Sequence, residues 1–183
     1  MVERSTQAIR RGPMPALAAV SLAPPAVRFS FRGSAEAARK AGPAFGCDLP
    51  TEACRAAVAD DRAALWLGSD EWLLLAFDDP AVQELAQTIE TALGDVPHAL
   101  VDISHRQVGI EVFGPAAPQV LNVGCPLDLA LEAFPVGMST RTVLAKADIT
   151  LWRQAEDRFR LETGRSFSPY VVALLAQAQA NLD

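Results

Sequence analysis

The sequence predicts an α+β fold made of two tandem strand-helix-hairpin-helix units that form a mainly antiparallel sheet with packed helices. Three observations support this prediction. The same order of elements occurs twice, each hairpin opens with a Leu-Trp pair, and each unit has a Gly-Cys pair ahead of its hairpin. An internal duplication explains this shared order better than a chance likeness of amphipathic patterns. We therefore expect one duplicated domain over 26–183, with repeat units at about 26–97 and 98–183.

Each unit is expected to begin with a strand that runs into a glycine and then into a helix of small residues. Gly33 in the first unit and Gly114 in the second are 81 positions apart. The Gly-Cys pairs at 46–47 and 124–125 are 78 positions apart. The similar offsets indicate that these segments are equivalent in the two units.

The hairpins follow these helices. They open at Trp66 and Trp152, which are 86 positions apart and are each preceded by a leucine. Their polar centres, at 68–71 and 154–157, indicate the turns. The offset is larger here than before the hairpins, which predicts extra residues in a long loop over 131–142.

Each unit closes with an amphipathic helix. Asp79 and Ser168 are the expected N-caps, and each precedes a proline suited to the first helical position. Every apolar position of the first helix recurs in the second 89 residues later. These positions are Val82, Leu85, Ala86, Ile89 and Leu93, then Val171, Leu174, Leu175, Ala178 and Leu182. Their spacing predicts one buried face per helix.

Composition limits the classes of partner. Half of the 183 residues are hydrophobic and 21% are charged, so we expect part of the surface to be covered by another molecule. The net charge of −6 and the pI near 4.9 argue against nucleic acid as a partner. No apolar stretch approaches the length that spans a membrane.

Residues 1–25 form a Pro-rich N-terminal arm that carries the basic pair Arg10 and Arg11. The arm resembles an export signal only faintly, because Pro13 and Pro15 interrupt a short apolar run. We therefore expect a cytoplasmic protein. Such an arm does not readily order itself, so a partner is expected to hold it if it is ordered.

The cysteines do not predict a metal site. Cys47, Cys54 and Cys125 have no C-x-x-C spacing, and His98 and His105 are the only histidines that could join them. The expected state is reduced, buried thiols.

The stretch 101–114 holds Asp102, Ser104 and His105, the side-chain types of a hydrolytic triad. The apolar phase reverses between Ile103 and Val108, which predicts a bulge or corner there. Adjacent residues of a strand point to opposite faces, so Ser104 and His105 are poorly placed to act together. A contact point for another chain is the better interpretation of this corner, and hydrolysis stays open as an alternative.

Other candidate sites have simpler structural interpretations. Glu71 lies at a hairpin tip beside Asp70, where carboxylates are usually solvated. The three tryptophans, at 66, 72 and 152, are expected to pack in the core rather than to form a stacking platform. Arg141 lies at the end of the long loop, just before an expected strand, where it is either solvated or bound to an anion or to a carboxylate of a partner.

Several motifs in one order carry a resemblance to a known family. They are D-I-S-H-R from 102, G-C-P-L-D-L from 124, R-T-V-L-A-K from 141 and R-S-F-S-P-Y from 165. Together they resemble the gamma subunit of heterotetrameric sarcosine oxidase over roughly residues 26–180.

The resemblance implies an accessory subunit in an assembly of four different chains. That assembly oxidises sarcosine to glycine, with oxygen as electron acceptor, and passes a one-carbon unit to tetrahydrofolate. The alpha and beta subunits are expected to hold FAD, FMN, NAD and tetrahydrofolate, and the delta subunit zinc. The gamma subunit is similar to the duplicated N-terminal folate-binding domain of aminomethyltransferase and is not known to catalyse. The resemblance therefore implies no catalytic, cofactor-binding or metal-ligating residue in this chain.

Two alternatives remain open. A related assembly, N-methylglutamate dehydrogenase, has a similar small subunit, so the amine substrate is not fixed. A free-standing folate-binding domain for one-carbon chemistry would need an open pocket and a carboxylate, for which Asp102 is the candidate. In the subunit interpretation, the expected interface residues are Arg10, Arg11, Ser104, His105, Arg106, Phe134 and Arg141.

Overall fold

The computed structural model describes residues 17–77 and 81–182, which form ten strands and four helices. The elements of the first half are β1 (Ala19–Leu22), β2 (Val27–Gly33), α1 (Ala35–Phe45), β3 (Ala56–Ala59), β4 (Arg62–Gly68), β5 (Glu71–Ala76) and α2 (Val82–Leu93). The elements of the second half are β6 (His98–Asp102), β7 (Gln107–Phe113), α3 (Ala117–Asn122), β8 (Ser139–Leu144), β9 (Ala147–Ala155), β10 (Arg158–Gly164) and α4 (Ser168–Ala180).

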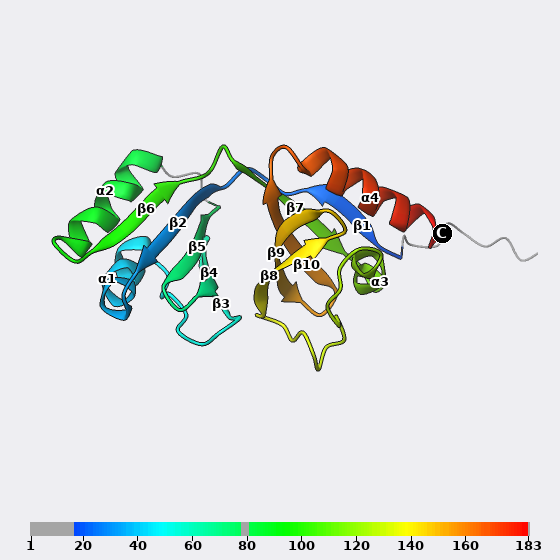
Figure 1. Cartoon of the computed structure of the whole chain (residues 1–183), viewed down its shortest axis with the longest axis horizontal. Helices are drawn as coiled ribbons and strands as arrows, with labels where there is room; N and C mark the ends of the chain where they lie inside the picture. Colours follow the sequence, from blue (N-terminus) through cyan, green and yellow to red (C-terminus); the bar gives the residue numbers. More distant parts are fainter. Residues whose placement is uncertain (1–16, 78–80, 183) are drawn as a thin grey trace, which may run out of the picture.

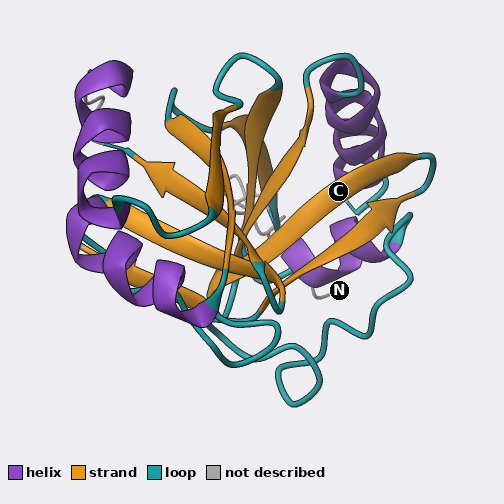
Figure 2. Cartoon of the chain, turned by 60° about the vertical axis from the view of Figure 1, so that its left-hand side comes forward, coloured by secondary structure: helices purple, strands orange, loops and turns teal. Residues whose placement is uncertain are grey.

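The strands form two antiparallel sheets that lie side by side (Figure 1). The first sheet has the order β3-β4-β5-β2-β6, and the second has the order β8-β9-β10-β7-β1. Helices α1 and α2 pack on the first sheet, and α3 and α4 pack on the second, so that strands lie between helices (Figure 2). Each sheet and its helices enclose a hydrophobic core, and a smaller cluster that includes Leu65, Leu73 and Trp152 joins the two halves.

The predicted α+β class and the order of elements within each unit are confirmed. The strands form two sheets rather than the expected single sheet. Each sheet includes one strand that comes from the other half of the chain. Strand β1 leads into β2 but pairs with β7, and β6 leads into β7 but pairs with β2. In this reciprocal exchange, Ala19 lies opposite Phe113 and Phe29 lies opposite Asp102. Local sequence patterns do not encode which strands pair, so the exchange is not visible in the sequence.

The predicted helices form with small differences at their ends. The N-cap Ser34 accepts a hydrogen bond from the backbone N–H of Ala37 at 3.2 Å and starts α1. Helix α2 begins at Val82, and its expected N-cap Asp79 lies outside the described residues. The prediction that Leu182 lies on the buried face of the helix is wrong. Helix α4 ends at Ala180, and the side chain of Leu182 is 36% exposed.

The predicted long loop is shorter than expected. Its last residues belong to β8, which pairs with β9 along its length, so Arg141 lies on a strand rather than on a loop. Only the two end residues of β8 are buried, and its first four residues are polar, so the sequence of this part resembles a loop. Phe134, in the remaining loop, is 1% exposed and packs in the core of the second half near Phe159.

A buried carboxylate joins the two sheets. Glu162 on β10 is 2% exposed and accepts a hydrogen bond from Arg28 Nε on β2 at 2.7 Å. On its own strand, it also accepts one from Arg160 Nε at 2.7 Å. Gly109 makes room for this pair, because a Cβ there would lie 2.5 Å from Arg160 Nη2. The carboxylate of Glu162 thus supplies a counter-charge to both buried arginines.

A second polar contact anchors β6 to the outer layer of the first half. His98 Nδ1 lies 2.7 Å from the carbonyl oxygen of Val96, and its Nε2 lies 2.7 Å from the carboxylate of Glu90 on α2. The carbonyl of Val96 has the largest effect and raises the pKa of His98. Glu90 raises it further, against the opposing effect of partial burial.

The described helices include none that is long and apolar enough to cross a membrane.

Removing the charge of Glu162 should strongly destabilise the fold. Glu162→Gln leaves Arg28 buried without a counter-charge and leaves Arg160 with the more distant Glu111, 3.7 Å away, so we expect the free energy of unfolding to fall by about 3–5 kcal/mol. The matched control is Glu52→Gln, which breaks an exposed ion pair with Arg55 and should cost less than about 1 kcal/mol. Urea unfolding followed by circular dichroism measures both, and equal losses in the two variants would contradict the role of the buried bridge.

Stability should also depend on pH through His98. Its folded-state pKa lies above the ordinary value of 6.5, so its contribution is complete below that value and is lost as pH rises through the folded-state pKa. His98→Gln should flatten this part of the stability profile, and His105→Gln should leave it in place because His98 remains. Thermal unfolding over a pH series checks this, and an identical profile in wild type and His98→Gln would refute it.

Candidate functional site

The corner between β6 and β7 is the point at which the chain passes from one sheet to the other. The hydroxyl of Ser104 donates to Asp102 Oδ1 at 2.6 Å and accepts the backbone N–H of Arg28 at 2.9 Å. The backbone N–H of Ser104 donates to the same Asp102 oxygen at 2.9 Å. These bonds tie the corner to β2. Ser104 and Asp102 thus stabilise the turn.

This arrangement does not favour the two chemical interpretations of the corner. Both hydrogen-bonding functions of the Ser104 hydroxyl are engaged, and its described hydrogen bonds do not reach His105. A nucleophile needs a base within hydrogen-bond reach. Of the two carboxylate oxygens of Asp102, the candidate to hold a folate, Oδ1 already accepts two hydrogen bonds from Ser104.

Glu71 differs from the sequence-based expectation of a solvated hairpin tip. It is 8% exposed, and it bonds Arg32 at 2.7 Å and Arg141 through both of its carboxylate oxygens. The hydrogen bond from Arg141 contributes most to lowering the pKa of Glu71, and the charges of both arginines lower it further against the effect of burial. Because Arg141 lies on β8, this fork-like pair links the second sheet to the first.

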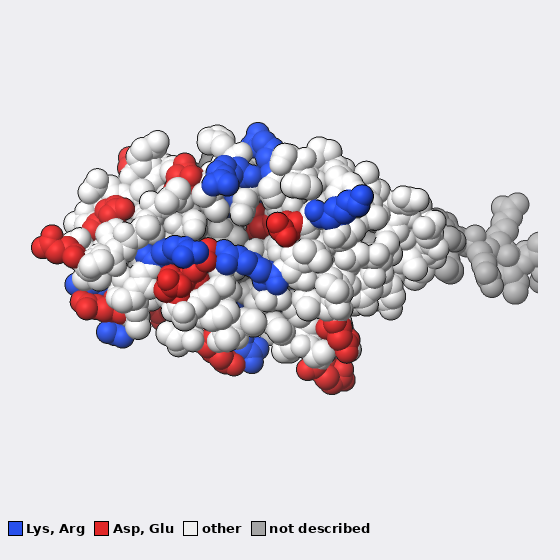
Figure 3. All heavy atoms as spheres, in the orientation of Figure 1, with Lys and Arg blue, Asp and Glu red and all other residues white. Residues whose placement is uncertain are grey.

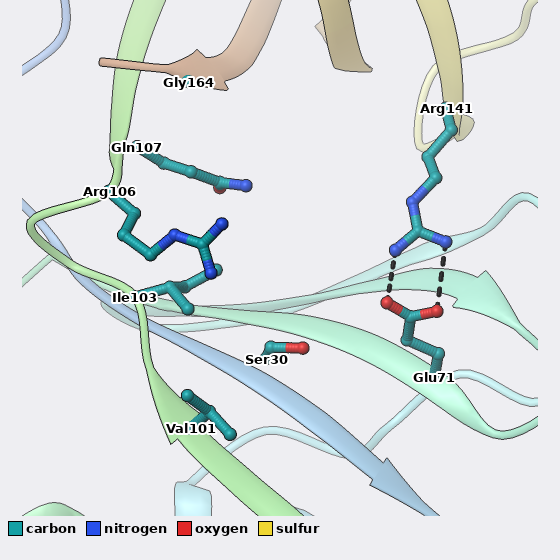
Figure 4. A pocket seen from close by; sticks show the side chains of 8 residues that line it. All are labelled: Ser30, Glu71, Val101, Ile103, Arg106, Gln107, Arg141 and Gly164. Atoms are coloured by element: carbon teal, nitrogen blue, oxygen red, sulfur yellow. Dashed lines mark hydrogen bonds and ion pairs between the residues drawn. The ribbon is translucent and has the colours of Figure 1, made fainter. Parts of the chain in front are cut away.

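A cavity of about 430 Å³ opens beside this pair, at the boundary between the two sheets. Its lining combines two arginines, a carboxylate, an amide, a hydroxyl and small or apolar groups. The lining residues are Ser30, Glu71, Val101, Ile103, Arg106, Gln107, Arg141 and Gly164. Figure 4 shows Arg106 and Gln107 entering from one side and Arg141 from the other, where it meets Glu71. The fold thus brings together Arg106 and Arg141, two of the residues expected from the sequence to contact a partner.

The other expected interface residues are placed differently. His105 is exposed and Ser104 is half-buried. Phe134 needs correction, because its side chain lies in the core of this chain and is not available to a partner. Arg10 and Arg11 lie outside the described residues.

Two of the three cysteines lie in the hydrophobic cores of different halves. Cys47 is buried in the core of the first half, where burial raises the pKa of its thiol, and Cys125 is buried in the core of the second. Within residues 17–77 and 81–182, no cluster of three or more His, Cys, Asp or Glu side chains is arranged to hold a metal ion. Trp72 and Trp152 are buried in cores.

A second candidate surface is the outward face of α4. Its sequence contains no Asp, Glu, Lys or Arg, and its exposed positions include Tyr170, Ala173 and Ala176. The equivalent helix α2 exposes Glu84, Gln87, Thr88, Glu90 and Thr91. In Figure 3 the half of the molecule that contains α4 shows few charged side chains, and many more lie on the other half and near the boundary. Gln177 is also exposed, so this face is uncharged rather than wholly apolar, and depletion of charge is typical of the centre of an interface.

Comparisons with known proteins agree on one family. The family model for "Sarcosine oxidase, gamma subunit family" matches residues 32–181. Sarcosine oxidase subunit gamma from Corynebacterium sp. (strain P-1) is 38% identical over 138 residues. That alignment covers 75% of this chain and 66% of the relative, so the chain spans just under two thirds of the relative's length.

Two solved structures are similar to the whole fold. Heterotetrameric sarcosine oxidase from Corynebacterium sp. U-96, in complex with pyrrole 2-carboxylate, matches with a TM-score of 0.84 and 29% identity, over 92% of this chain and 87% of that one. Aminomethyltransferase T of the glycine cleavage system from Bartonella henselae matches with a TM-score of 0.65 and 17% identity, over 87% of this chain and 45% of that one. The second likeness is one of fold alone.

The hydrogen bonds between Glu71 and Arg141 should affect the pKa of Glu71 and, through it, the stability of the fold at acidic pH. A lowered folded-state pKa contributes stability above the ordinary pKa that is lost as pH falls through the folded-state value. Arg141→Gln removes the largest cause of the shift, so the pKa of Glu71 should rise. Carboxyl-carbon NMR titration measures this, with Arg39→Gln on the exposed face of α1 as control. An unchanged Glu71 titration in Arg141→Gln would contradict the geometry.

Proposed function

Because the chain belongs to the sarcosine oxidase gamma subunit family, we propose that it is a non-catalytic accessory subunit of a heterotetrameric, flavin-dependent sarcosine oxidase. The family expected from the sequence motifs is confirmed. In this proposal the partners are the alpha, beta and delta subunits of a cytoplasmic enzyme. They hold FAD, FMN, NAD, tetrahydrofolate and zinc, and the assembly demethylates sarcosine to glycine.

The uncharged outward face of α4 carries this proposal. The two closing helices derive from one duplicated pattern and pack on equivalent sheets, so α2 is an internal reference for a solvated helix. Ala173 follows Glu84 by 89 positions, the offset that relates the two helices, and both residues are exposed. Charge is thus present at this position on α2 and missing on α4.

The side chains on this face are those that protein interfaces favour. Phe167, beside the start of α4, is 46% exposed, and Tyr170 is 38% exposed. Aromatic residues are enriched and charged residues depleted in the centre of interfaces. Small side chains at Ala173 and Ala176 leave the helix accessible to close packing by another chain.

The geometry favours a structural role over a free-standing folate domain. The carboxylate that would have to hold the folate, Asp102, is engaged in the corner turn. Recovery of the tagged chain from its own host cells tests the subunit proposal. We expect larger, flavin-containing chains to come with it and to oxidise sarcosine. Faster oxidation of N-methylglutamate would indicate the related dehydrogenase, and a soluble, colourless monomer would contradict the proposal.

A charge placed on the face of α4 should weaken assembly. Ala173→Glu gives α4 the residue that α2 has at the equivalent position, so burying it against a partner would be costly. We expect at least about tenfold less partner protein to be retained, which corresponds to roughly 1.4 kcal/mol.

The matched control is Ala92→Glu, which adds the same side chain to the exposed surface of α2. Quantitative pull-down from co-expressing cells measures retention, and circular dichroism checks that each variant is folded. Equal retention by wild type and Ala173→Glu would exclude this face as an interface.

A further inference from the structure

We propose that the cavity at the boundary between the two sheets binds the carboxylate of an Asp or Glu side chain from a partner subunit. The inference rests on the proposed function, because it takes the ligand to be part of another chain of the assembly. The cavity has a volume of about 430 Å³ and is lined by Arg106 and Arg141, which enter it from opposite sides (Figure 4).

Arg106 is the residue that receives the carboxylate. Its backbone N–H donates to the carbonyl of Ile103 at 2.9 Å, and its carbonyl accepts the N–H of Arg165 at 2.8 Å. Its guanidinium has no ion pair or side-chain hydrogen bond to any described residue, and the residue is exposed. A fixed backbone with an unoccupied guanidinium suits two-point binding of a carboxylate.

The charge of the cavity favours an anion. Glu71 is the one carboxylate among its lining residues, and Arg32 and Arg141 already bond it. Arg106 adds a guanidinium that Glu71 does not bond, so the lining has two arginines to one carboxylate, on a chain whose net charge is −6. An adjoining cavity contains Asp148 and Glu162.

The apolar lining fits the same occupant. Val101 is 51% exposed at the cavity and lies on β6, the outermost strand of the first sheet. Ile103 lines the cavity beside it. An acidic residue next to an apolar one, in a segment that crosses the boundary of the sheets, would cover both the guanidinium and these side chains.

The test is the stability of the purified assembly that contains tagged wild-type or variant chain. Arg106→Glu reverses the charge, and we expect it to retain at least about tenfold less partner protein than wild type. Arg106→Lys should retain an intermediate amount, because a point charge replaces the two-point fork. Arg39→Glu, an equal charge change on the exposed face of α1, should retain partners as wild type does. Circular dichroism checks that each variant is folded.

Comparing wild type with Arg106→Glu distinguishes failure of the cavity proposal from failure of the subunit proposal. If wild type and Arg106→Glu both retain the partners equally, the cavity proposal is overturned while the subunit proposal stands. If wild type retains no partner, the subunit proposal itself fails, and this inference with it.

Sodium acetate, compared with sodium chloride at equal ionic strength, tests the source of the carboxylate. We expect acetate to release partners from wild type more effectively than chloride does. Acetate that perturbs the NMR signal of the Arg106 guanidinium without releasing partners would identify a free small acid as the ligand and overturn the docking proposal.

Discussion

The reciprocal exchange of β1 and β6 is the constraint on which the rest of the structure depends. Each sheet is completed by a strand that the chain supplies from the neighbouring half, so neither half has its full set of strands alone. The passage from β6 to β7 is fixed by the bonds of Ser104 to Asp102 and Arg28. The bridge from Arg28 to Glu162 then joins the two sheets through the interior. Together these contacts make one body from two similar halves.

That construction explains how a duplicated fold can serve as a structural subunit. The two halves keep equivalent cores, and their outer surfaces have diverged. Helix α2 of the first half exposes charged and polar side chains, whereas α4 of the second exposes Tyr170, Ala173 and other uncharged side chains. Polar groups gather instead at the boundary between the sheets, where Glu71 and Arg141 close one side of a cavity. Two distinct surfaces are therefore available to partners, one apolar and one polar.

The sequence predicted the features that depend on local periodicity and missed those that depend on distant pairing. The repeated Leu-Trp hairpins, 86 residues apart, and the constant 89-residue offset between the closing helices identified both units. By contrast, Glu71 looked solvated because Arg141, its main partner, lies 70 residues away. The first part of β8, residues 139–142, is polar and has the composition of a loop, and Phe134 in the preceding segment lies in the core. The partner of β1 or β6 is not encoded within either strand.

The most direct test of this account is amide hydrogen exchange of the chain measured alone and within the purified assembly. The account predicts slower exchange in α4 and in the corner at 103–107 on assembly, with α2 unchanged. Unchanged exchange in α4 together with strong protection of α2 would contradict the claim that the second half and the sheet boundary form the assembly surface.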